Sequence, residues 1–247
     1  MVVGNKPIGG EFALSPISFC TSATDCQLPT AFATGRSAFR AILRRLEVSG
    51  FIEIYLPDYL CTSVVDTAVH AGFSVRRYPI GPNLHIMPEV LDVFAGIAAP
   101  FAILIVDYFV LLDLSVDIAT LQHLGGIVVL DKVQALHEER TFGAEYWFSG
   151  LRKFLPVPEG AFAGSHEGSI TADGLSAGAG YVKALAGVIK FIALSTGSYT
   201  VPDDVFGFGS FASLPETAYL SLFQLGEEMI DADAGISIVS TLFGKLY

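Results

Sequence analysis

Two apolar runs, at 101–109 and 126–131, constrain the fold of this chain more than any other feature. They read FAILIVDYF and GIVVLD, and neither shows the apolar–polar alternation of a strand with one exposed face. Such runs are typical of parallel strands that are covered on both faces. A helical pattern at 118–124 lies between them, and parallel neighbours need a crossover of this kind.

Strand and helix patterns also alternate upstream of these runs. Between 37 and 46, Phe39, Ile42 and Leu43 recur at helical spacing, with arginines on the opposite side. The further elements that we expect are a strand at 51–57, a helix at 63–71 and a strand at 73–80. This order predicts a three-layer α/β/α fold with a mostly parallel sheet, which binds ligands beyond the carboxyl ends of its strands.

The two ends of the chain show weaker patterns. Residues 1–34 are rich in Gly, Pro, Ser and Thr, which predicts an irregular arm. Helical spacing recurs at 179–194, 216–231 and 236–246, and no second sheet is expected there. We therefore expect an arm over 1–34, a large domain over 35–190 and a helical segment over 191–247.

The composition is apolar enough to raise the question of a membrane segment. Hydrophobic residues make up 52% of the chain and the mean hydropathy is +0.55. The longest apolar stretch, 94–112, is broken by Pro100 and Asp107, whereas a bilayer helix needs about 20 uninterrupted apolar residues. We interpret the stretch as a buried strand, and the excess apolar surface as a subunit interface.

Charge and cysteine content exclude several classes of partner. The net charge of −11 opposes binding to nucleic acid and to anionic membranes, which leaves small molecules as the expected ligands. Cys20, Cys26 and Cys61 form neither a disulfide framework nor a metal pattern, and no His-x-x-x-His pair occurs, so we expect no metal. Without an apolar signal segment, the expected location is the cytoplasm.

Asp131 is the first candidate site residue, because it ends an apolar strand at the edge where ligands bind. A buried carboxylate needs a partner, so Asp131 caps a helix or turn, pairs with a cation, or contacts a ligand. Gln134 follows three residues later and shares a face with Asp131 if a helical turn begins there.

Lys153 is the second candidate, in the sequence WFSGLRKFLPVPEG. A lysine held against apolar walls has a lowered pKa and becomes a usable amine. The alternative is an ordinary solvated cation beside Arg152.

The third candidate is the helix start Thr34-Gly35-Arg36-Ser37. Backbone N–H groups at a helix N-terminus bind anions, and the helix dipole favours negative charge there. The alternative is a simple N-cap.

Taken in order, these motifs resemble the pyridoxal-phosphate enzymes of the aspartate-aminotransferase fold, and most of all the DegT/StrS-type sugar aminotransferases. The resemblance implies that Lys153 bonds covalently to pyridoxal 5'-phosphate and that Asp131 contacts its ring nitrogen. It also implies a homodimer with active sites at the subunit interface. The remaining cofactor-binding positions that it implies are Gly35, Arg36, Ser37, Cys61, Gln134 and Ser149.

The sequence departs from this family at several positions. Cys61 stands where the family places an aromatic residue on the cofactor, and Val110 stands where it has glycine. The run EGA, at 159–161, replaces a double glycine. The family also continues into a C-terminal small domain, so we expect a shortened or missing small domain in 191–247.

Three functions remain open from the sequence. The first is a pyridoxal-phosphate-dependent aminotransferase that moves an amino group from an amino acid to a keto sugar or similar metabolite. The second is a catalytically inactive relative with a binding or assembly role. The third is an unrelated α/β binding protein in which Lys153 has no special role.

Overall fold

The computed structural model describes residues 31–97, 100–135, 140–155, 157–168, 170–171, 175–176, 179–196, 218–232 and 236–237. The chain divides into two compact units, which are described separately below. The first, called the sheet unit, comprises Pro29–Gly150 and Ala161–Ala172. The second, called the helical unit, includes Leu151–Gly160 and Asp173–Tyr247.

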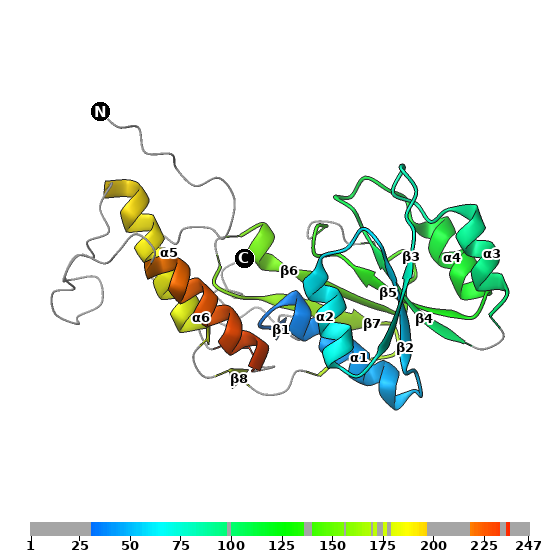
Figure 1. The fold of residues 1–247 in the computed structure, drawn as a ribbon, viewed down its shortest axis with the longest axis horizontal. Helices are drawn as coiled ribbons and strands as arrows, with labels where there is room; N and C mark the ends of the chain where they lie inside the picture. Colours follow the sequence, from blue (N-terminus) through cyan, green and yellow to red (C-terminus); the bar gives the residue numbers. More distant parts are fainter. Residues whose placement is uncertain are drawn as a thin grey trace. The chain divides into compact units, whose positions relative to one another are not determined.

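The sheet unit contains a seven-stranded sheet of order β1-β7-β6-β5-β4-β2-β3 (Figure 1). β2, β3, β4, β5 and β6 are parallel to one another, whereas β7 runs antiparallel to both of its neighbours. The strands are β1 (Ala31–Phe32), β2 (Glu53–Pro57), β3 (Ser74–Tyr78), β4 (Phe101–Val106), β5 (Gly126–Asp131), β6 (Tyr146–Gly150) and β7 (Ala161–Ser165). The predicted mostly parallel sheet is therefore confirmed.

Two helices pack on each face of this sheet. α1 (Gly35–Val48) and α2 (Thr62–His70) share one buried cluster with strand residues such as Leu104 and Val129. α3 (Pro88–Ala95) and α4 (Ser115–His123) share the other with Ile103 and Val128. Because adjacent residues of β4 and β5 enter opposite clusters, both faces of these strands are apolar, as their sequence predicts.

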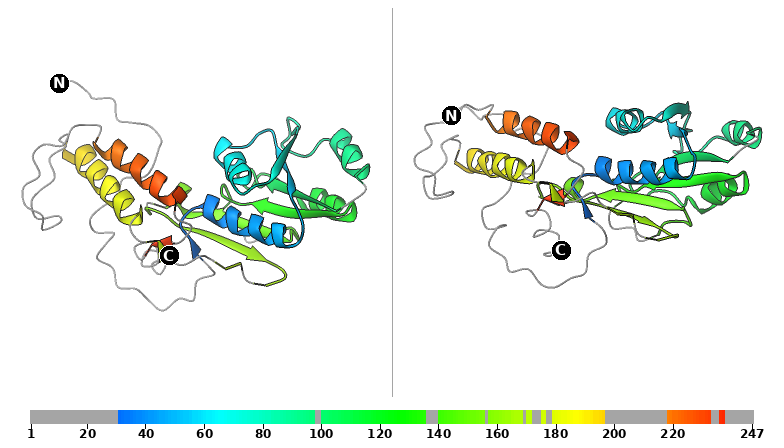
Figure 2. Two further views of the ribbon diagram at one scale, coloured as in Figure 1. Left: turned by 60° about the horizontal axis from the view of Figure 1, so that its bottom comes forward. Right: turned by 90° about the horizontal axis from the view of Figure 1, so that it is seen from below.

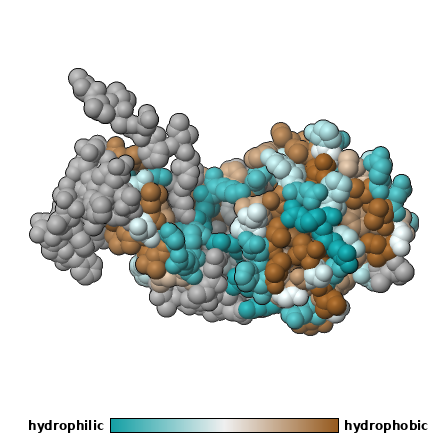
Figure 3. Space-filling view, viewed as in Figure 1, coloured by the Kyte–Doolittle hydropathy of each residue, from teal (hydrophilic) through white to brown (hydrophobic). Residues whose placement is uncertain are grey.

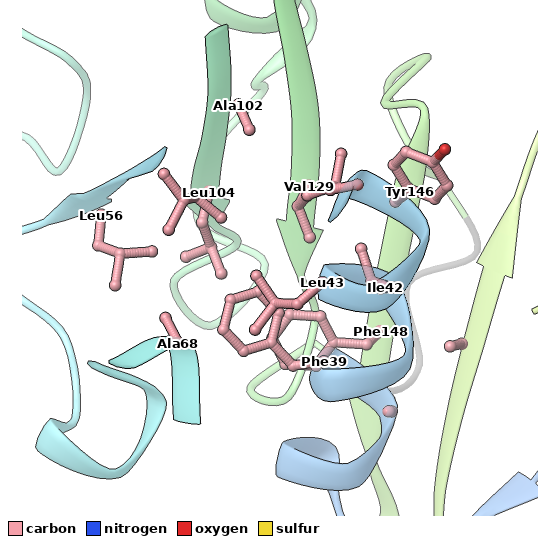
Figure 4. Close-up of a cluster of buried hydrophobic side chains, with 14 of the residues drawn as sticks. Phe39, Ile42, Leu43, Leu56, Ala68, Ala102, Leu104, Val129, Tyr146 and Phe148 are labelled. Carbon is pink, nitrogen blue, oxygen red and sulfur yellow. The ribbon is translucent and has the colours of Figure 1, made fainter. Parts of the chain in front are cut away.

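Figure 4 shows the first cluster, in which Phe39, Ile42 and Leu43 of α1 point toward the strands. Phe39 stacks on Phe148 of β6, with the ring centroids 5.2 Å apart. This contact fixes the start of α1 beside the carboxyl end of β6.

Several expected boundaries change in the structure. The run 101–109 is a strand only to Val106, because Phe109 and Val110 both adopt a φ of 61° and turn the chain out of the sheet. β1 lies inside the expected irregular arm, and β6, β7 and α3 did not appear as elements in the sequence pattern. β5, at Gly126–Asp131, has the predicted bounds.

The helical unit contains two long helices, α5 (Ala179–Thr196) and α6 (Ala218–Ala232). Figure 2 shows them side by side in both views. α5 crosses the expected domain boundary between 190 and 191. The helix expected at 236–246 is wrong at Ile236–Ser237, which forms strand β9 parallel to β8 (Leu175–Ser176), and the rest of that segment lies outside the described residues. The β-branched residues of this stretch favour an extended chain.

Among the described residues, apolar side chains fill the two clusters of the sheet unit and a third in the helical unit, and others lie at the surface. No helix among the described residues is long and apolar enough to cross a membrane. The face of the sheet unit seen in Figure 3 carries hydrophobic patches between polar ones. Exposed large apolar side chains of this unit include Tyr59, Phe109 and Leu111.

Candidate functional site

Asp131 is buried at the carboxyl end of β5, with 5% of its surface exposed. Its Oδ1 accepts a hydrogen bond of 2.8 Å from the backbone N–H of Val133, which closes a tight turn after the strand. Its backbone carbonyl accepts a 2.9 Å hydrogen bond from the N–H of Asp107. One carboxylate oxygen of Asp131 thus caps the turn, which was one of the roles expected for it. The turn lies at the carboxyl ends of the strands, the edge at which sheets of this kind bind ligands.

The start of α1 packs directly on this turn. A side chain at Gly35 would bring its Cβ within 3.1 Å of the Val133 side chain, so this position requires a residue without a bulky side chain. A Cβ built at Gly150 would lie 3.5 Å from the other γ-methyl group of Val133. Val133 therefore lies between the helix start and the end of β6, which brings three of the predicted segments together.

Thr34 is the N-cap of α1, and Ser37 in the first turn of the helix is its partner. Thr34 Oγ1 accepts a 3.1 Å hydrogen bond from the backbone N–H of Ser37, and the two hydroxyl oxygens also lie 3.1 Å apart. Both residues are buried. The N-cap interpretation is thus realised, and it leaves a helix N-terminus facing the edge that holds Asp131.

The other predicted residues of the sheet unit lie around this edge in different environments. Ser149 is buried in β6, opposite Phe162 of β7, while Arg36 is half-buried in the first turn of α1. Gln134 belongs to the turn after Asp131, and its Oε1 is buried without a hydrogen-bond partner among the described residues. Cys61 is exposed at the start of α2, with its Sγ 3.1 Å from Ser63 Oγ.

Tyr108 is a site residue that the sequence interpretation missed. Burial is the main cause that raises its pKa from 10.0 to about 12, and the negative charge of Asp131 is the next. Its hydroxyl donates a 2.5 Å hydrogen bond to the backbone carbonyl of Tyr59, and the two rings lie 5.4 Å apart. Tyr108 therefore ties the segment before α2, which includes Cys61, to the edge that holds Asp131.

A second acid and a lysine follow the same two strands. Asp107 is fully buried after β4, where its Oδ1 accepts a 3.2 Å hydrogen bond from the N–H of Val110. Lys132, next to Asp131, is 5% exposed, with its Nζ 5.6 Å from the ring centroid of Trp147. Since successive residues of a strand point to opposite faces, Lys132 lies on the face opposite Asp131. In the sequence, Lys132 could have been noticed because it directly follows Asp131 at the end of an apolar strand.

Lys153 belongs to the helical unit and is described apart from the residues above. It is the last residue of a single 3-10 turn, η2 (Leu151–Lys153), and its side chain is exposed. An exposed side chain agrees with the solvated-cation alternative and not with a lysine held against apolar walls.

Several solved structures resemble this chain at low sequence identity. They include ureidoglycine–glyoxylate aminotransferase of Bacillus subtilis, at 12% identity and a TM-score of 0.46, over 90% of this chain and 56% of that one. Serine palmitoyltransferase of Sphingomonas wittichii matches at 14% identity and a TM-score of 0.45, over 82% and 47%. A Streptococcus pneumoniae protein assigned as a sugar aminotransferase, in its PMP form, matches at 15% identity and a TM-score of 0.47, over 91% and 61%.

The chain spans about half the length of the solved structures that it matches. No family model matches the sequence, and no curated protein matches it. At this level of similarity, the chemistry has to be argued from the residues of the chain itself.

Proposed function

We propose that this chain binds pyridoxal 5'-phosphate and acts as an aminotransferase, which moves an amino group from an amino acid to a keto sugar or similar small metabolite. The observation that carries the proposal is the buried carboxylate of Asp131 at the end of β5, in a turn packed against the N-terminus of α1. An acid and an anion-binding helix start at one sheet edge suit a ligand that carries both a basic ring nitrogen and a phosphate.

The described residues fit this cofactor in the sheet unit. The first turn of α1 offers backbone N–H groups and the half-buried guanidinium of Arg36 to a phosphate. Gly35 allows the close approach of the Val133 turn, which brings Asp131 next to that helix start. Ser149, buried in β6 one residue before Gly150, is a further phosphate contact in this proposal.

Each residue has a distinct chemical role. When bound, the cofactor supplies an electron sink for the carbon that loses a proton. With the cofactor bound, Asp131 would keep the ring nitrogen protonated and the ring electron-poor. Lys153 would provide the primary amine that holds the cofactor, and would then accept and return the substrate proton as a general base.

Tyr108 supports this arrangement from the neighbouring strand. With its pKa at about 12, it remains protonated at neutral pH and keeps donating its hydrogen bond to Tyr59. A neutral hydroxyl beside Asp131 adds no second negative charge to the edge. Tyr108 therefore holds the segment that includes Cys61 without opposing a bound anion.

We propose a cytoplasmic homodimer as the working form, and the exposed apolar side chains of the sheet unit support the dimer. Tyr59, Phe109 and Leu111 expose between 56% and 69% of their surface. Exposed apolar groups of this size are typical of surfaces that a partner covers. Sedimentation equilibrium of the purified chain tests this part of the proposal, and a monomer at micromolar concentration contradicts it.

The test of the proposed function is to add pyridoxal phosphate, record the visible absorption band, reduce with borohydride and locate the modified lysine by peptide mass spectrometry. We expect Lys153 to be modified in the wild type and in the control Lys190→Ala, and the band to be lost in Lys153→Ala. A wild type that gives no band refutes the proposal.

A second candidate, a catalytically inactive relative that binds the cofactor, is favoured by the exposed side chain of Lys153. The two candidates differ in their response to amino acids. If the band forms but no amino acid removes it, the inactive relative is the better description.

A further inference from the structure

The loop that carries Lys153 is tied to the two long helices of the helical unit by a partly buried network of charges. Arg152 Nη2 donates a 2.7 Å hydrogen bond to Glu227 Oε1 on α6. The Nζ of Lys183, from α5, donates to the same carboxylate oxygen. One glutamate thus joins the loop to both helices.

Glu227 is the member of this network on which the others depend. The Lys183 side chain is fully buried, and a buried ammonium is stable only with a partner. Gly226 makes room for it, because a side chain there would place its Cβ 2.3 Å from Lys183 Cγ. The sequence Gly226-Glu227 therefore supplies both the space and the carboxylate that Lys183 needs.

The loop itself is closed and packed on the same helices. The N–H of Leu151 donates a 2.9 Å hydrogen bond to the carbonyl of Gly160, so the two ends of Leu151–Gly160 meet. Val157 is buried with Ala184 and Val188 of α5, and Leu155 packs against this cluster. Apolar contacts hold one side of the loop, and the Arg152–Glu227 pair holds the turn that precedes Lys153.

The geometry of η2 explains why Arg152 and Lys153 differ. A 3-10 helix has three residues per turn, so neighbouring side chains point about 120° apart. Arg152 turns toward the half-buried Glu227 and is itself half-buried, whereas the next residue, Lys153, is directed outward and is exposed. Fixing Arg152 therefore also fixes the backbone of η2 and the side from which the Lys153 side chain leaves it.

We propose that Glu227 is a positioning residue, which acts through Arg152 to hold the η2 turn, and with it the start of the Lys153 side chain, on the α5–α6 pair. The inference rests on the proposed function, in which Lys153 is the reacting amine. It assigns a role to the C-terminal helices, which the sequence motifs left without one.

The test compares Arg152→Gln with the wild type, because Glu227→Ala also removes the ion pair that Glu227 makes with buried Lys183 and can unfold the unit. The first measurement is hydrogen exchange at the amides of Phe154, Leu155 and Val157, whose hydrogen bonds lie within the loop. The second is the rate at which pyridoxal phosphate, trapped with borohydride, modifies Lys153. We expect Arg152→Gln to exchange about tenfold faster and to be modified about tenfold more slowly, because tenfold corresponds to about 1.4 kcal/mol, the size of one charge-assisted hydrogen bond.

Two further variants separate positioning from general loss of structure. Arg152→Lys keeps a cation that can reach Glu227, and we expect it to restore most of both rates. Glu228→Gln removes the same charge from the exposed neighbour on α6, which contacts Gln224, and we expect it to change neither rate. Circular dichroism checks that the helices remain folded in each variant.

The outcomes distinguish this inference from the proposed function. Unchanged loop exchange in Arg152→Gln overturns the positioning role, whatever the cofactor does. If exchange responds and Arg152→Lys restores it, while wild-type Lys153 does not react, the positioning of the loop stands and the proposed function fails.

Discussion

Val110 provides the sharpest test of the described backbone, because it is a β-branched residue in a left-handed conformation. Its φ is 61°, and 41% of its surface is exposed. The left-handed conformation costs a residue with a side chain about 1–2 kcal/mol, whereas glycine adopts it freely. The loop after β4 therefore stores conformational strain next to the edge that holds Asp131.

Comparing Val110→Gly with Val110→Ala isolates this strain, since both variants lose the same apolar side chain. The glycine variant avoids the cost of the left-handed conformation. It loses about 0.5–1 kcal/mol of stability, however, because its unfolded chain is more flexible than that of the alanine variant. At position 110 we therefore expect the glycine variant to be about 0.5–1 kcal/mol more stable than the alanine variant.

Val93 is the matched control, because it is 66% exposed and lies in the right-handed helix α3. There the glycine variant should be less stable than the alanine variant by about 0.5–1 kcal/mol. Subtracting the glycine–alanine difference in unfolding free energy at position 93 from that at position 110 cancels the flexibility of glycine and leaves the left-handed strain, about 1–2 kcal/mol.

Urea unfolding of all four variants, followed by the fluorescence of Trp147, measures these differences. Trp147 is the only tryptophan of the chain and lies in β6, so it reports on the sheet unit. If alanine is as stable as glycine at position 110, or the two positions behave alike, the left-handed backbone at Val110 is wrong.

The remaining predictions concern the edge around Asp131. Asp131→Asn should keep the turn, because the amide oxygen still accepts from the N–H of Val133. Its free energy of unfolding should lie within about 1 kcal/mol of that of the wild type. Its rate of amino-acid turnover should fall by at least about 100-fold. Stopped-flow measurement of the visible band decides this, and an Asn variant of wild-type rate removes Asp131 from the proposed mechanism. The pKa of Tyr108 is raised in the folded chain, so its contribution to stability is complete below pH 10.0 and is lost as the pH rises to about 12. The free energy of unfolding, measured across this range, should fall less steeply in Tyr108→Phe, and equal slopes contradict the raised pKa.

The central strands could be predicted because their sequence carries a tertiary signal. Residues of β4, and those of β5 before Asp131, are apolar at every position, which is typical of a sheet covered on both faces. The alternation of residues such as Ile103 and Leu104 between the two clusters confirms that interpretation. Asp131 was found for the same reason, because an acid at the end of such a run is conspicuous.

Other features depend on contacts that the local sequence does not encode. Tyr108 follows β4 in an apolar stretch, so its pattern continued the strand, and only the hydrogen bond to Tyr59, 49 residues away, shows its role. β7 was missed because the sequence AFAGS has small residues in place of a strand pattern, and antiparallel pairing with β6 makes it a strand. The ion pair that ties the loop of Lys153 to α6 joins Arg152 to Glu227, 75 residues further along the chain.

Gly150 pairs with Ala161 although a long connection separates β6 from β7. These two residues pair at the end where β6 and β7 are connected, the position at which a hairpin normally makes its turn. The ten residues between them belong instead to the helical unit. The loop with Lys153 is thus an insertion into a hairpin that a two-residue turn such as Asn-Gly could close directly. Excising it in this way would leave every strand of the sheet unit in place, and it would also show whether Asp131 and the α1 N-terminus bind an anion without any lysine from the insertion.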